Sequence, residues 1–224
     1  MRVARTGALA TLDLASGGPL ATLVSIGSAY DGAPLFLLST LAQHTKNLAA
    51  DPRASLLLTG PDGRGDPLNR PRLTVSGPIA AHPAPSARAR FVARNPKSKL
   101  YASFADFSVF KMEISAVHFN GGFARAAALT PKDILTDLVD ADALIAAEPM
   151  LLEEINARGP AFLARLAGSG RGDRMPNWRA IGLDPEGLDL SAGPRAARIS
   201  FGARSQSPQA WRKTLAAYSR KRRG

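Results

Sequence analysis

The polar side chains best suited to chemistry gather in one short segment. An apolar run at 35–38 leads directly into a segment, 39–47, that is rich in hydroxyl, imidazole, amide and ammonium groups. The candidate site residues in it are Ser39, Thr40, His44, Thr45, Lys46 and Asn47. If a helix starts here, its first backbone N–H groups lack intrahelical partners and its dipole favours negative charge, so these residues could hold an anion such as a phosphate. The alternative is an ordinary strand-to-helix corner with a solvated polar face.

A strand and a short helix must position this segment. Thr40 and Gln43 have the spacing of a capping box, which predicts that the helix starts at Thr40. A helical wheel then divides the following residues between two faces. One face carries Leu41, Thr45, Leu48 and Ala49, and the other carries Gln43, His44 and Asn47. We expect the second face to be the polar, open one.

Around this segment the sequence predicts many short strands with helices between them. Apolar runs and alternating patterns, bounded by Gly, Pro and Asp, predict strands at 8–14, 20–26, 35–38, 54–59, 72–75, 110–114 and 117–119. Helices are expected at 85–94 and 96–103, and Gly77-Pro78 predicts a bulge or a sheet edge. This arrangement favours a small β-barrel.

The pattern of the chain changes near residue 130. Thr130-Pro131-Lys132-Asp133 combines an N-cap residue, a proline at the first helical position and an acidic residue at N3, so a helix is expected to start there. Helical patterns dominate 131–167, and a hairpin over 178–190, a strand at 198–201 and a helix from Ser207-Pro208 follow. We predict an α+β protein with two domains: a barrel at 1–129 and a smaller α+β module with a basic tail at 130–224.

Composition limits the class of protein. With 224 residues, of which 45% are hydrophobic and 21% charged, the chain is long enough for one large or two smaller packed domains. The absence of cysteine excludes disulfides, thiolate metal sites and cysteine nucleophiles, and it favours an intracellular protein. The N-terminal residues lack the apolar core of a signal peptide, and no segment has membrane-spanning length. We expect a cytoplasmic protein with no membrane partner.

The net charge of +11 raises the question of nucleic-acid binding. Residues 212–224 hold six lysines and arginines and no acidic residue, so much of the excess charge is a tail at a helix end, where the dipole favours basic residues. Aromatic residues make up only 6% of the chain and do not alternate with the basic ones, so no stacking platform is evident. Nucleic acid is not expected as a partner.

Several motifs, in this order and spacing, resemble a known family. They are Leu38-Ser39, His44-Thr45-Lys46-Asn47-Leu48, Asp51-Pro52-Arg53-Ala54-Ser55-Leu56, Pro71 to Gly77, Asp106-Phe107 and Gly121 to Ala126, with Asp184 to Leu190 in the second domain. Together they resemble the FMN-binding split β-barrels of the pyridoxamine-phosphate-oxidase superfamily, and most closely its HugZ-type haem-utilisation family. The resemblance implies a homodimer that binds a cofactor between two barrels.

The resemblance also implies roles for particular residues. The segment from Ser39 to Asn47 would surround the phosphate of FMN, with His44 about where the oxidases have an arginine. Thr22 lies where they use another phosphate-binding arginine, and Arg72 where they use a glutamine near the flavin ring. Because Thr22 is uncharged, the expected phosphate cage has few fixed charges. The C-terminal Arg and His motif by which the true oxidases hold their substrate is not recognisable here, so a vitamin B6 oxidase is not expected.

Three functions follow from these residues and the resemblance. The first is an FMN-binding flavoprotein, an oxidoreductase that acts on a small substrate. The second is a haem-binding or haem-degrading protein that uses the same dimer cleft, with His44, His118 or an arginine near the iron or the propionates. The third is a non-catalytic binding module. His82 and His118 are each most simply structural, and three scattered histidines have no zinc-site spacing, so no metal site is expected.

Overall fold

The computed structural model describes residues 1–60, 66–122, 126–168 and 176–221. The chain folds into two compact units. The first contains residue 1 and residues 3–135, and the second contains residue 2 and residues from 136 onward. The domain boundary before residue 130 that the sequence suggests stays a prediction.

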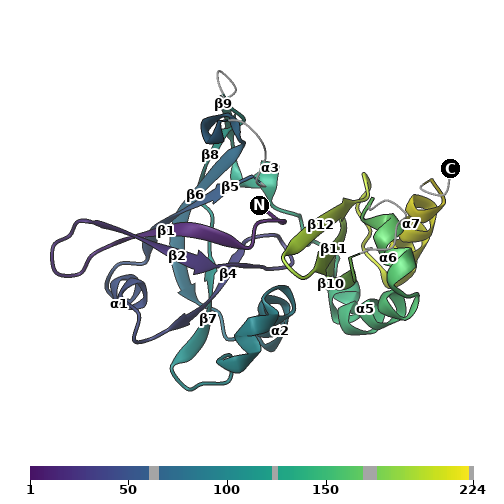
Figure 1. Ribbon diagram of the computed structural model, residues 1–224, viewed down its shortest axis with the longest axis horizontal. Coiled ribbons are helices and arrows are strands. Elements are labelled where there is room, and N and C mark those ends of the chain that lie inside the picture. Colours follow the sequence, from purple (N-terminus) through teal and green to yellow (C-terminus); the bar gives the residue numbers. More distant parts are fainter. Residues whose placement is uncertain (61–65, 123–125, 169–175, 222–224) are drawn as a thin grey trace. The chain divides into compact units, whose positions relative to one another are not determined.

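A curved antiparallel sheet forms the body of the first unit (Figure 1). Its strands are β1 (Thr6–Leu12), β2 (Pro19–Ser25), β3 (Gly27–Ser28), β4 (Pro34–Ser39), β5 (Arg53–Thr59), β6 (Arg72–Ala81), β7 (Phe107–Met112), β8 (Ala116–Asn120) and β9 (Ala126–Leu129). Their order across the sheet is β2-β1-β5-β6-β7-β4-β3, and β8 joins β6 to β9 beside this path. The expected split barrel is confirmed, while the short β3 and β9 were not expected.

Strand β6 organises this sheet because one of its edges has two successive partners. Residues 72–76 pair with β8 and residues 79–81 pair with β7, while β5 pairs along the other edge. Gly77 lies where the partner changes. A Cβ atom on Gly77 would lie 1.8 Å from the carbonyl oxygen of Glu113, so the connection from β7 to β8 can run this close beside β6 only at a glycine. The expected bulge or edge at Gly77-Pro78 is therefore a change of partner within a continuous strand.

Two α-helices pack against the sheet of the first unit at different places. Helix α1 (Gln43–Ala50) lies against β1, and α2 (Pro85–Arg94) lies against β3 and β4 (Figure 1). Short 3₁₀ helices cover Pro67–Asn69 and Pro96–Leu100, the second of which replaces the longer helix expected at 96–103. One apolar cluster contains Leu9, Phe36 and Leu56, and another contains Leu35 and Phe91 of α2.

The C-terminal part of the chain contains several short helices and a three-stranded sheet. Its elements are α3 (Pro131–Ile134), which still belongs to the first unit, then α4 (Asp142–Ala146), α5 (Glu148–Ala157), α6 (Pro160–Leu166), β10 (Arg179–Asp184), β11 (Gly187–Ala192), β12 (Arg195–Ser200) and α7 (Pro208–Lys221). The capping box of Thr130 and Asp133 is present at the start of α3. Pro149 and Pro160 each lie in the first turn of a new helix, which explains why the helical pattern at 131–167 divides into pieces.

The second unit has its own core. Leu151, Leu163, Leu188 and Trp211 are buried in one cluster, and α5 and α6 pack against β10. This confirms the expected α+β class. Within the described residues no helix is both long and apolar enough to cross a membrane.

Candidate functional site

The segment after β4 is a hydrogen-bonded turn that precedes α1. The Ser39 hydroxyl donates to the Asp106 carboxylate at 2.5 Å and accepts from the backbone N–H of Leu41 at 3.1 Å. The backbone N–H of Thr40 donates to the carbonyl of Asp106 at 2.8 Å, and that of Ala42 donates to the carbonyl of Ser39 at 3.1 Å. Ser39 and Asp106 therefore stabilise the turn between β4 and α1. We call this turn, together with α1 and the neighbouring Thr22 of β2, the corner. Asp106 was not among the expected site residues, although it lies in one of the family-like motifs.

Helix α1 begins at Gln43, later than the capping-box pattern predicts. Its N-cap residue is Ala42, which makes no side-chain hydrogen bond. The expected capping box is wrong because the turn at 39–42 places Thr40 outside the helix, and the Gln43 amide donates instead to Asn47 Oδ1 at 3.0 Å. The N-terminus of α1 therefore has no capping side chain.

Asn47 is fully buried, so the expectation that it shares an open face with His44 is wrong. Its Oδ1 accepts from the backbone N–H of Leu14 at 3.2 Å, and its Nδ2 donates to the Thr11 hydroxyl at 3.1 Å. Helix α1 contacts both β1 and the loop after it, so two of its faces are covered, which a helical wheel does not reveal. Asn47 thus anchors α1 to the sheet.

His44 and Thr22 meet in this corner, as the sequence analysis expects of two residues of one site. His44 Nδ1 lies 3.1 Å from Thr22 Oγ1, and the Thr22 hydroxyl donates to the carbonyl of Leu9 at 3.5 Å. Two tautomers fit this distance: when the Thr22 proton is directed to Leu9, the Thr22 oxygen accepts from Nδ1–H and Nε2 keeps a lone pair, whereas in the other tautomer Thr22 donates to Nδ1. Burial lowers the pKa of His44 below the ordinary value of 6.5, so its imidazole is neutral at pH 7.

The other polar residues of the segment differ in exposure. Thr45 is buried, and within the described residues its Oγ1 has no hydrogen-bond partner. An unpaired buried hydroxyl costs about 1–3 kcal/mol, so a ligand that reached it would gain a hydrogen bond. Lys46 and Thr40 are exposed. Leu41, which precedes α1, is 74% exposed, so the corner offers apolar surface as well as polar groups.

Arg72 lies outside this corner. It is the first residue of β6, and β1 and β5 separate that strand from β2, which carries Thr22. Its guanidinium donates to the carbonyl of Leu68 at 2.7 Å. Within one chain the structure therefore brings Thr22 together with residues of α1, but not with Arg72.

The face of the sheet that points away from the core carries few charged residues near the edge formed by β2 and β1. The outward residues of β1 and β2 are Thr6, Ala8, Ala10, Leu12, Pro19, Ala21, Leu23 and Ser25. Leu23 is 78% exposed and pairs with Ala8, which pairs in turn with the 39% exposed Leu57. The row continues through Thr74 to His118. A sheet face turned to water normally carries polar residues, so this face has the character of a contact surface.

Fold and corner together define the class of the chain: a split β-barrel with a strand-turn-helix corner beside its edge strand β2. A family model described as pyridoxamine 5'-phosphate oxidase matches residues 2–121. That match spans more than half of the chain. The chain therefore belongs to the pyridoxamine 5'-phosphate oxidase family, as its motifs suggest.

Three known proteins are similar to this chain in sequence or structure. A protein of unknown function from Agrobacterium tumefaciens is 37% identical, with a TM-score of 0.82 over 96% of this chain and 90% of that one. A heme binding protein from Mycobacterium smegmatis is 27% identical, with a TM-score of 0.56 over 99% of this chain and 93% of that one. The chloroplastic heme oxygenase HOZ of Arabidopsis thaliana is 32% identical over 115 residues, which are 49% of this chain. The match spans about a third (34%) of the length of that curated relative.

The lowered pKa of His44 predicts a pH dependence. In the unfolded chain the imidazole takes up a proton near pH 6.5, whereas in the folded chain it does so only at lower pH, so the unfolded state binds more protons in between. The free energy of unfolding should therefore rise with pH through this interval, and protonation of His44 should destabilise the fold. An NMR titration, with the His44 resonance identified by its loss in His44→Gln, should give a midpoint below 6.5. A midpoint at or above 6.5 would contradict the buried, neutral imidazole.

Proposed function

We propose that this chain binds haem at the corner between β2 and α1, as a homodimer, and that it serves in haem utilisation. The observation that carries the proposal is His44, whose Nδ1 lies 3.1 Å from the Thr22 hydroxyl. In the tautomer with the proton on Nδ1, Nε2 keeps the lone pair that would bind the iron. When bound, haem supplies a redox-active iron.

His44 has the properties of a ligand for that iron. Imidazole binds a metal in its neutral form, and a hydrogen bond to its other nitrogen fixes both the tautomer and the ring orientation. Thr22 supplies that hydrogen bond at 3.1 Å, and burial keeps the pKa of His44 low enough for a neutral ring at pH 7. The carbonyl of Leu9, which accepts from the Thr22 hydroxyl, completes the chain that orients the ring.

The surroundings of His44 also suit a tetrapyrrole. A porphyrin has a large apolar face and two carboxylates at its edge. Leu14, whose backbone N–H donates to α1, is 62% exposed, and Leu41 is 74% exposed, so both could cover part of an apolar ring. Lys46 is an exposed cation in the same helix, where it could meet a propionate. Two relatives are named for haem, one of which aligns with nearly the whole chain.

FMN is the second candidate, and one observation favours it. Helix α1 has no capping side chain, and the buried Thr45 hydroxyl of its first turn has no partner among the described residues, so a phosphate could use both. Haem is preferred because a neutral imidazole can bind its iron, whereas FMN offers no such contact and Thr22 and the neutral His44 stand where the oxidases have arginines for its phosphate. Lys46 would be the main cation for the two negative charges of the phosphate.

The homodimer is proposed from the outward face of the sheet. Leu23 and Leu57 expose apolar surface in one cross-strand row, and none of the outward residues of β1 and β2 is charged. Leu23 and Thr22 are neighbours on the edge strand β2 but point to opposite faces of the sheet. A second copy packed on the Leu23 face would therefore cover that face, and it would reach the corner only around the free edge of β2.

A haem titration followed by the Soret absorbance tests the first proposal. The full chain should bind one haem per subunit, and His44→Ala should weaken binding by roughly tenfold or more and change the spectrum, because the iron loses its ligand. Added imidazole should restore the original spectrum. His82→Ala, which removes a histidine that follows β6, is the matched control and should behave as wild type.

Equal affinity and equal spectra in wild type and His44→Ala would mean that His44 is not the ligand. Parallel titrations with FMN and riboflavin separate the second candidate. If the corner holds a flavin phosphate instead, Lys46→Ala should weaken FMN by roughly tenfold while riboflavin, which lacks the phosphate, is unaffected.

Light scattering tests the proposed dimer. Wild type should have twice the mass of one chain at micromolar concentration, and Leu57→Asp should shift the protein towards the monomer, because a carboxylate would be buried at the contact. Leu100→Asp changes an equally apolar residue, 79% exposed in a 3₁₀ helix, and should leave the dimer intact. A monomeric wild type, or identical masses for wild type and Leu57→Asp, would contradict the proposed face.

A further inference from the structure

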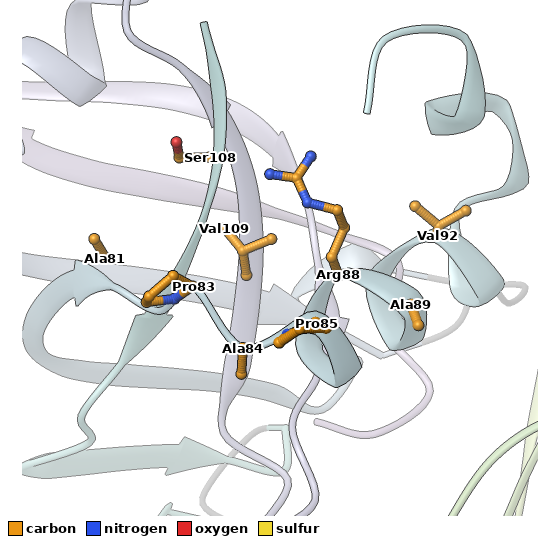
Figure 2. A pocket seen from close by; sticks show the side chains of 9 residues that line it. All are labelled: Ala81, Pro83, Ala84, Pro85, Arg88, Ala89, Val92, Ser108 and Val109. Carbon is orange, nitrogen blue, oxygen red and sulfur yellow. The ribbon is translucent and has the colours of Figure 1, made fainter. Parts of the chain in front are cut away.

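A second hollow in the first unit lies between α2 and the strands β6 and β7 (Figure 2). Its volume is about 540 Å³, within the range of small-molecule sites. Most of its lining is apolar and consists of small or rigid side chains. These are Ala81, Pro83, Ala84, Pro85, Ala89, Val92 and Val109. The hollow shares no residue with the corner at His44.

Two polar residues, Arg88 and Ser108, interrupt this apolar lining. Arg88 extends from α2 towards the strand that carries Ser108 and Val109, and its guanidinium lies on the other side of that strand from the Ser108 hydroxyl (Figure 2). The guanidinium donates to the backbone carbonyl of Ala102, and at 3.2 Å to that of Phe107, the residue before Ser108. Two of its five N–H groups are thus used to hold it in place, and the others remain for a ligand.

The charge of Arg88 has no counterpart. Within the part of the chain that the structure describes, no carboxylate forms an ion pair with it, and no acidic residue lines the hollow. Arg88 is half-buried, so water screens its charge less than that of a fully exposed residue. A guanidinium binds a carboxylate through two parallel hydrogen bonds, the geometry for which it is best suited.

We propose that this hollow binds a small aliphatic carboxylic acid, with the carboxylate on Arg88 and the hydrocarbon chain against the alanines, prolines and valines. One cation matches one negative charge, which favours a monocarboxylate over a phosphate. The site is independent of the haem corner and does not depend on the proposed function.

Calorimetric titration of the full chain with octanoate and with octan-1-ol tests the site, because the alcohol has the same chain without the charge. Wild type should bind one octanoate, and Arg88→Met should weaken octanoate by roughly tenfold or more while octan-1-ol is unaffected. Lys97→Met, which removes an exposed cation elsewhere in the first unit, is the charge-matched control and should bind octanoate as wild type does.

A second variant separates binding from the structural role of Arg88 at the carbonyls of Ala102 and Phe107. Ala89→Phe leaves Arg88 in place and fills the hollow from the exposed side of α2, so it should weaken octanoate and octan-1-ol alike. The proposal is overturned if wild type binds no octanoate. It is equally overturned if Arg88→Met, Ala89→Phe and wild type bind it with the same affinity, or if Arg88→Met weakens the alcohol as much as the acid.

Discussion

The close approach of two backbone segments at Gly77 is the constraint on which the first unit depends. There the chain between β7 and β8 runs close beside β6, and the carbonyl of Glu113 occupies the space that a side chain at Gly77 would need. Two hydrogen bonds, from the backbone N–H of Glu113 to the carbonyl of Pro78 and from that of Ser115 to the carbonyl of Ser76, fix the register. As a result, one edge of β6 pairs with both β7 and β8, while its other edge pairs with β5. The sheet can therefore curve into a split barrel instead of continuing flat.

The corner at α1 depends on this curvature because its parts come from distant strands. Pairing with β7 sets the end of β4 at Ser39, and pairing with β1 sets Thr22 on the edge strand. Asn47 then ties α1 to Thr11 of β1, which brings His44 within 3.1 Å of Thr22. The position of the His44 imidazole therefore depends on strands β1, β2 and β4 and on the buried amide of Asn47. This local arrangement is the reason we propose haem rather than FMN for the corner.

Much of the fold could be predicted from the sequence, because the apolar periods of β1, β2, β4, β5, β7 and β8 are clear and turn residues separate them. The continuity of β6 through Gly77-Pro78 could not, since those two residues ordinarily end a strand and only the close approach of the chain at Glu113 explains them. At the site, it is the resemblance to the oxidases that predicts a shared location for Thr22 and His44. The burial of Asn47 and the late start of α1 were missed, because both result from contacts with residues more than thirty positions away and from a turn held by Asp106.

Hydrogen–deuterium exchange of the full chain, with and without haem, tests most directly whether the corner between β2 and α1 is the haem site. Peptides that cover residues 19–25 and 40–48 should exchange more slowly when haem is bound, because the ligand and the ordered partner face would restrict local opening. Peptides from the second unit, such as residues 179–192, should change little. Protection confined to the second unit, with 19–25 and 40–48 unchanged, would contradict the account.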